Sequence, residues 1–220
     1  MRFFSWLSDL LYPPKCVFCG KLLKQEETDL CRKCRQNLPA VQEKIERGQF
    51  FDPCYCLYYY EDAVASSIRR FKFSGQQQYA GAYGRLLAML LLREQAEFDV
   101  LSWVPISRKR ARQRGYHQTM LIARETGKAL GRPAVQTLEK IRNNPPQSSL
   151  HRPEERQGNV RGVYRAWKPE NYQGNRVLLI DDVITSGATL TECSFTLLRA
   201  GAAKVLCATV AVTRPGKTKQ

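Results

Sequence analysis

The segment from Val177 to Thr189 constrains the fold more than any other part of the sequence. Four apolar residues, Val177–Ile180, run without interruption into Asp181 and Asp182. A continuous apolar run of this kind is typical of a strand buried on both faces of a parallel sheet. The two carboxylates then fall at the carboxyl end of the strand, where open α/β sheets bind ligands. The segment therefore predicts a ligand site at the edge of a parallel sheet.

Small and hydroxyl-bearing residues follow the two acids and open the next predicted helix. Unpaired N–H groups and the positive end of the helix dipole make such a helix start suitable for phosphate. A helix N-cap alone would need one Ser or Thr and no paired acids, so it explains less of the segment. The candidate phosphate-binding residues are Thr185, Ser186, Gly187, Ala188 and Thr189.

The chain beyond residue 54 alternates between strand-like and helical patterns. With 220 residues, 43% of them hydrophobic, it is long enough for one good core and a small appendage. Alternating strands and helices predict an α/β fold, a parallel sheet flanked by helices. The expected strands are Tyr55–Tyr60, Val100–Val104, Val135–Leu138, Val177–Ile180 and Val205–Val212, and the expected helices are Ala63–Phe71, Tyr79–Arg93, Thr119–Leu130 and Thr189–Ala200.

Two Cys-x-x-Cys pairs precede this region and predict a structural zinc site. Each pair can present two thiolates from a tight turn to one tetrahedral Zn²⁺. Four unrelated reduced cysteines are the alternative, and the role of Cys54 and Cys56 stays open. The candidate ligands are Cys16, Cys19, Cys31 and Cys34, which places a zinc module in residues 1–53 and the α/β domain in residues 54–220.

The segment Val177–Thr189 also resembles the phosphoribosyl pyrophosphate (PRPP) signature of type I phosphoribosyltransferases. The resemblance implies that Thr185–Thr189 wrap the 5-phosphate and that Asp181 and Asp182 accept hydrogen bonds from the ribose hydroxyls. Mg²⁺ would come with the pyrophosphate. The two acids would then act as catalytic groups electrostatically, by stabilising the cationic sugar that forms at C1.

Positive charge is concentrated in the larger domain. Residues 61–220 hold 26 Lys and Arg against 13 Asp and Glu, a net of +13 out of +15 for the whole chain. Such a surplus favours phosphate-rich ligands or nucleic acid, and basicity that only aids solubility is the alternative. Five cations lie close together in the loop expected after the strand Val100–Val104. We expect Arg108 to bind the pyrophosphate of PRPP, and Arg110, Arg112 and Arg114 are candidates for nucleic-acid binding.

Further matching residues are spread along the chain, namely Phe71–Gly75, Pro105, Arg108, Arg114–Gln118, Gln147, Leu150, Glu155, Arg156, Asn159 and Val160. Together with Val177–Thr189, they resemble the ComF (ComFC) competence family. The resemblance implies an amino-terminal zinc module fused to a phosphoribosyltransferase domain, a role in DNA uptake during natural transformation, and a helicase-like competence ATPase as partner. The basic surface suggests single-stranded DNA as a ligand. An active transferase with an unidentified acceptor is the alternative, because fold alone cannot separate the two.

Four remaining features complete the expectations. No apolar stretch approaches the roughly 20 residues that cross a bilayer, so we expect no transmembrane segment and a cytoplasmic protein. Met1–Leu11 has one apolar face at helical spacing and predicts a short helix that docks on the protein, with association at a membrane surface as the alternative. Ile141–Gly162 predicts a long functional or disordered loop. The sequence around His117 and around His151 is not specific enough to identify either residue as a catalytic base.

Overall fold

The structure is a computed structural model, and it describes residues 13–42, 45, 48–142 and 161–214. The predicted helix in Met1–Leu11, most of the predicted loop in Ile141–Gly162 and the tail after Arg214 lie outside the described residues.

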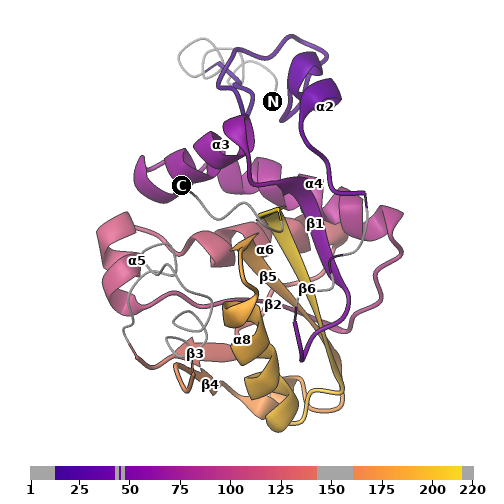
Figure 1. Ribbon diagram of the computed structural model, residues 1–220, viewed down its shortest axis with the longest axis vertical. Coiled ribbons are helices and arrows are strands. Elements are labelled where there is room, and N and C mark those ends of the chain that lie inside the picture. Colours follow the sequence, from indigo (N-terminus) through magenta and orange to yellow (C-terminus); the bar gives the residue numbers. More distant parts are fainter. Residues whose placement is uncertain (1–12, 43–44, 46–47, 143–160, 215–220) are drawn as a thin grey trace, which may run out of the picture.

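A four-stranded parallel sheet forms the centre of the larger domain (Figure 1). Its strands are β1 (Cys54–Tyr59), β2 (Val100–Trp103), β5 (Arg176–Ile184) and β6 (Lys204–Val212), in the order β1-β6-β5-β2. The apolar runs of β5 and β6 are buried on both faces, as parallel strands require. The predicted parallel α/β sheet is therefore confirmed.

The predicted strand Val135–Leu138 differs in the structure. Ala134 forms a single parallel bridge with Leu101, and the chain then leaves the sheet. Strand β3 (Leu138–Lys140) pairs instead with β4 (Tyr164–Ala166) in a separate antiparallel hairpin. The hairpin brings the two ends of residues 141–163 together below the main sheet (Figure 1).

Helices cover both faces of the sheet, with α8 (Ala188–Arg199) in front and α4 (Tyr79–Arg93) and α6 (Gln118–Leu130) behind (Figure 1). Helices α4 and α6 pack closely at Gly84, where an added Cβ would lie 2.5 Å from Cβ of Glu125. The short 3₁₀ turn η2 (Pro169–Asn171) leads from β4 toward β5. No helix among the described residues combines the length and the apolar character that crossing a bilayer requires.

Successive residues of β5 point to opposite faces of the sheet. Leu178 and Ile180 belong to the core beneath α4 and α6, whereas Val177 and Leu179 belong to the core beneath α8. This alternation continues into the two acids. It places Asp182 on the side of α4 and α6 and Asp181 on the side of α8.

The cysteine-rich module packs on the domain through helix α3 (Asp62–Phe73) and α4. The Phe18 ring contacts the rings of Tyr58 and Tyr83, with centroids 5.1 and 6.0 Å apart. Buried residues of the module and of the domain form one continuous hydrophobic core. The boundary at residue 53 stays a prediction, but the two parts do not fold over separate cores.

Candidate functional site

Asp182 is fixed by side chains from two other elements. Lys72, near the end of α3, places its Nζ 2.7 Å from Oδ1 of Asp182, and Nε2 of Gln118, at the start of α6, donates to Oδ2 at 3.4 Å. The Asp182 side chain is only 7% exposed. A buried carboxylate needs such partners, because removing its charge from water is otherwise costly. The carboxyl end of β5 is therefore joined to α3 and α6.

Asp181 lies in a different environment from its neighbour. Burial, and then the nearby Asp182 carboxylate, raises the pKa of Asp181 to about 7. Its Oδ1 accepts a hydrogen bond from the backbone N–H of Asp182 at 2.8 Å, and Lys72 and Lys140 act in the opposite direction on the pKa. The pair thus combines one carboxylate held in ionic contact with one that titrates near neutrality.

Lys140 extends from the β3–β4 hairpin toward Asp181. Its Nζ lies 3.4 Å from Oη of Tyr164 and 5.2 Å from the centroid of that ring. Burial, and then the positive charge of Arg110, lowers the pKa of Lys140 to about 8. A cation whose charge is destabilised in this way favours an incoming anion, because the anion restores the protonated form.

The loop after β5 leads directly into the first turn of α8. Gly187 caps this helix with φ of 80°, a left-handed conformation that glycine adopts without strain. The first intrahelical hydrogen bond is donated by Thr191 N–H to the Gly187 carbonyl at 2.8 Å. The three N–H groups ahead of it, at 188–190, lie at the positive end of the helix dipole. Thr185, Ser186 and Thr189 are partly or fully exposed around this turn.

The basic segment after β2 is a helix, α5 (Arg108–Arg114), rather than the predicted loop. Ser107 caps it by accepting a hydrogen bond from Arg110 N–H at 3.3 Å. The Arg108 side chain is 86% exposed and contacts Glu139 Oε1 at 3.5 Å. Burial, and then Arg114, lowers the pKa of Arg110, which also interacts electrostatically with Lys140. Arg110 therefore lies further inward than Arg108, on the side of Lys140. Arg112 is exposed.

His117 supports the backbone next to this segment. Its Nε2 accepts a hydrogen bond from the backbone N–H of Ile106 at 3.1 Å. Burial, and then the charge of Arg114, lowers the pKa of His117 to about 4, so the ring is neutral at pH 7. The geometry gives His117 a hydrogen-bonding role, and the described structure offers it no acidic partner that would make it a base.

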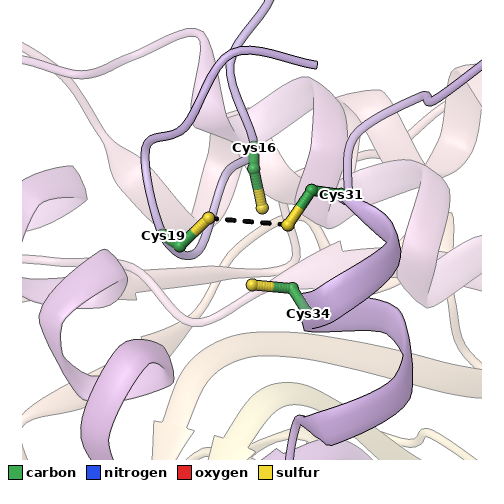
Figure 2. A group of neighbouring side chains, drawn as sticks. All are labelled: Cys16, Cys19, Cys31 and Cys34. Atoms are coloured by element: carbon green, nitrogen blue, oxygen red, sulfur yellow. Dashed lines mark hydrogen bonds between the residues drawn. The ribbon is translucent and has the colours of Figure 1, made fainter. Parts of the chain in front are cut away.

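The four predicted metal ligands form the second candidate site. Figure 2 shows Cys16 and Cys19 on one loop and Cys31 and Cys34 at the start of α2 (Arg32–Asn37), with their sulfurs directed toward one another. All four Sγ atoms lie within 4.8 Å of one another, and those of Cys19 and Cys31 are 3.6 Å apart. Tetrahedral zinc with Zn–S bonds of about 2.3 Å separates its sulfurs by about 3.8 Å. The cluster therefore fits a structural zinc ion.

Backbone groups stabilise the thiolate of Cys16, whereas burial raises the pKa of Cys19, the other member of the first pair. Burial acts to raise the pKa of Cys16, but backbone N–H groups of Cys19, Cys31 and Phe18 outweigh it and lower the pKa to about 7. Gly20 has φ of 75°, and its N–H closes the turn by donating to the Cys16 carbonyl at 2.9 Å. This turn supplies backbone donors to a thiolate, as zinc knuckles require.

Cys54 and Cys56 do not extend this site. Both are buried in β1, with Sγ atoms 3.8 Å apart, and Sγ of Cys56 lies 3.1 Å from Oγ1 of Thr209. Among the described residues, only the four cysteines of the module form a cluster of three or more metal-ligating groups.

Three residues beside the acids were not identified from the sequence, namely Lys72, Gln118 and Lys140. Lys72 and Gln118 fall inside segments that carry the family resemblance, but neither has a local pattern that marks it as a neighbour of Asp182. Lys140 is one cation among many, and only the hairpin places it near Asp181.

Comparison with known proteins agrees with this architecture. The double zinc ribbon domain matches residues 7–45, and the phosphoribosyl transferase domain matches residues 121–220. The chain is 28% identical to competence protein F of Haemophilus influenzae, over 87% of this chain and 82% of that protein. It is 28% identical to the DNA utilization protein YhgH of Salmonella typhimurium, over 89% and 90% of the two chains. With competence protein ComFC of Bacillus subtilis it shares 27% identity, over 86% and 73%.

Solved structures show a more distant similarity. An allosteric regulatory enzyme of purine biosynthesis aligns with 60% of this chain, at 26% identity and a TM-score of 0.42. Glutamine PRPP amidotransferase from B. subtilis aligns with 64%, at 23% identity and a TM-score of 0.45. The chain spans 26% and 30% of those two proteins. The two matched domains, and the similarity to competence protein F, YhgH and ComFC along most of the sequence, show that the chain is similar to the ComF (ComFC) family of competence proteins.

Proposed function

We propose that this protein binds PRPP with Mg²⁺ at Asp181 and Asp182 and handles single-stranded DNA during DNA uptake in the cytoplasm. The observation that carries the proposal is the order of groups at the carboxyl end of β5, where two acids precede the first-turn N–H groups of α8. The names of the relatives, competence and DNA utilization proteins, support the cellular role. A helicase-like competence ATPase is the proposed protein partner.

The residues around the acids suggest how each part of PRPP is held. The turn at Thr185–Thr189 would take the 5-phosphate, and the two acids would accept hydrogen bonds from the ribose hydroxyls. Lys140 and Arg110 are placed to neutralise the pyrophosphate, and the exposed Arg108 would have to turn away from Glu139 to join them. Mg²⁺ bound with the ligand supplies additional charge neutralisation there.

Lys72 has a separate part in this arrangement. Its ammonium group lies 2.7 Å from Oδ1 of Asp182. Ribose hydroxyls must therefore use the remaining lone pairs of Asp182 or displace Lys72 toward the phosphates. Either outcome keeps a cation at the site, which suits a ligand with several negative charges.

Isothermal titration calorimetry with Mg²⁺ and PRPP tests the site. We expect millimolar or tighter binding by the wild type, and substantial weakening by the double substitution Asp181→Asn and Asp182→Asn. Asp99→Asn is a matched control, because Asp99 is a carboxylate beside Arg176, at the start of β5, the opposite end from the two acids. Identical heats for the wild type and the double variant would refute the assignment.

Binding to single-stranded DNA is tested by its dependence on salt. The net charge of +13 in residues 61–220 supports an electrostatic contribution, which counterion release makes sensitive to salt. Fluorescence anisotropy with a labelled oligonucleotide should show affinity falling steeply between low and moderate salt. An affinity that does not change with salt would reject this account.

An active phosphoribosyltransferase is the second candidate function. It is favoured by the presence of both acids beside a cationic side chain, the arrangement that stabilises a cationic sugar and a departing pyrophosphate. Incubation with Mg²⁺, PRPP and candidate bases or DNA, followed by measurement of pyrophosphate release, separates the two. Steady turnover would establish the enzyme, and binding without turnover would leave PRPP as a bound effector.

A further inference from the structure

The last three residues of α3 lie where α5, α6 and β5 meet, each at a different depth from the surface. The buried Phe71 ring packs on Tyr116, with centroids 5.6 Å apart. Lys72 comes next and reaches Asp182, which Gln118 also contacts. Phe73 is outermost, and its ring lies 5.3 Å from the guanidinium carbon of Arg114. The Phe73–Arg114 pair therefore lies at the outer edge of the candidate PRPP site.

Phe73 adds little to the hydrophobic core. Its side chain is 73% exposed, the largest exposed fraction among the large hydrophobic side chains that the structure describes as exposed. Arg114, at the last position of α5, is half-buried and contacts Phe73. The inner position of Phe71 shows that an aromatic residue at this end of α3 can be fully buried, so packing does not account for Phe73.

We propose that Phe73 and Arg114 form a stacking platform for a nucleobase next to the PRPP site. Aromatic rings and guanidinium planes both stack on bases, with little dependence on which base is present. Lys109 and Arg112 are exposed cations on α5, the helix that also carries Arg114, and they can bind the phosphates of a nucleic-acid backbone. The proposal rests on the proposed function, because it assigns the group that meets the PRPP site.

The surroundings favour a base over an apolar protein surface. Phe73 is preceded by Lys72 and followed by Ser74 and Gly75, and its ring partner is an arginine. A protein-docking surface would require a contiguous apolar patch rather than a single ring between polar groups. A base stacked on Phe73 would also lie near the ribose of PRPP, since the preceding residue, Lys72, contacts Asp182. The base belongs either to single-stranded DNA or to a free nucleotide.

Anisotropy measurements with labelled oligothymidylate test the platform. Phe73→Ala should weaken binding by about fivefold or more, since removal of one aromatic stacking partner costs about 1–3 kcal/mol per base. Phe73→Trp should restore it, because tryptophan retains a stacking surface. Arg114→Lys should give an intermediate loss, because it keeps the charge but removes the plane.

Phe195→Ala is a matched control for these variants. Phe195 is also exposed, at 37%, and also lies under an arginine, with Arg199 5.7 Å from its ring centroid. It is on α8, however, and its ring packs on Phe50, with centroids 5.0 Å apart. Oligonucleotide affinity should therefore be unchanged in Phe195→Ala. Equal losses in Phe73→Ala and Phe195→Ala, or no loss in Phe73→Ala, would overturn the platform.

Two further measurements separate the sources of the base and the two proposals. Competition by thymidine monophosphate in the wild type but not in Phe73→Ala would show that the platform takes a free nucleotide, and absence of competition would assign it to DNA.

Phe73→Ala should bind PRPP as the wild type does. If Phe73→Ala loses oligonucleotide binding and the wild type does not bind PRPP, the result would support the platform and refute the PRPP site. A wild type that binds neither oligothymidylate nor thymidine monophosphate would refute the platform alone.

Discussion

Lys72 and Asp182 form an ion pair with an N–O distance of 2.7 Å that joins the end of α3 to the end of β5. The same helix contacts the loop between the first two cysteines. Nη2 of Arg70 donates to the Phe18 carbonyl at 2.6 Å, and the Ser67 hydroxyl donates to the Val17 carbonyl. The zinc module and the candidate PRPP site are therefore linked through three side chains of one helix, within two turns.

Substitution of Arg70 should weaken PRPP binding without any contact to the ligand. Arg70→Ala removes a charged hydrogen bond that fixes α3, and with it Lys72, so we expect a loss of about fivefold in affinity by calorimetry. Arg85→Ala is the control, since Arg85 joins the module to the domain through α4 by its ion pair with Asp29. Equal losses of PRPP affinity in Arg70→Ala and Arg85→Ala would mean that the contact through α3 contributes no more to binding than the contact through α4.

PRPP affinity should depend on pH with a maximum between the pKa values of two side chains. Asp181, with a pKa of about 7, must ionise to accept hydrogen bonds, so affinity should rise as pH increases through 7. Lys140, with a pKa of about 8, must be protonated to attract phosphate, so affinity should fall above 8. Calorimetry across this range checks both limbs. Lys140→Arg should remove the fall at high pH, and Asp181→Asn should remove the rise at low pH.

Asp181→Asn should stabilise the ligand-free protein at pH 8. The native pKa of Asp181 is raised above the unfolded value of 3.8, so the native state binds more protons and loses stability as pH rises from about 4 to about 7. Asparagine removes that penalty, and each 1 kcal/mol gained raises Tm by about 2–4 °C. Asp99→Asn should have the opposite sign, because Arg176 holds the pKa of Asp99 at about 2. A fall in Tm for Asp181→Asn would contradict the pKa assignment.

The metal content of the purified protein should be one zinc ion per chain. Cys34→Ser should abolish it, because tetrahedral zinc in a structural site requires all four ligands. The double substitution Cys54→Ser and Cys56→Ser should leave the zinc content unchanged, since those thiols lie in β1 and belong to no larger cluster of described ligands. Elemental analysis gives both results, and two zinc ions in the wild type would reveal a site that the four-cysteine cluster does not explain.

The sequence predicted the features that depend on local order in the chain. The apolar run before Asp181 became β5, and the hydroxylic turn became the start of α8, because burial and capping act within a few residues. The cysteine spacing likewise predicted a cluster that the structure brings together.

Features that depend on contacts between distant segments were missed. Lys72 precedes its partner Asp182 by 110 residues, and only the packing of α3 reveals the pair. The helix α5 was missed for another reason. Ser107 and Gly115 are a good cap at each end, but the charged run between them lacks the apolar spacing that predicts a helix from sequence.

The position of β6 in the sheet has a consequence for biosynthesis. It is the last strand along the described chain, yet it lies between β1 and β5 and pairs with both. Strand β1 therefore leaves the ribosome about 150 residues before its partner. The cysteine turns can bind zinc early, because their ligands are close together in the sequence. The sheet cannot form until its middle strand, β6, has been synthesised. We expect the nascent chain to expose the edge of β1 until β6 has been synthesised, which makes the unfinished domain a natural substrate for chaperones.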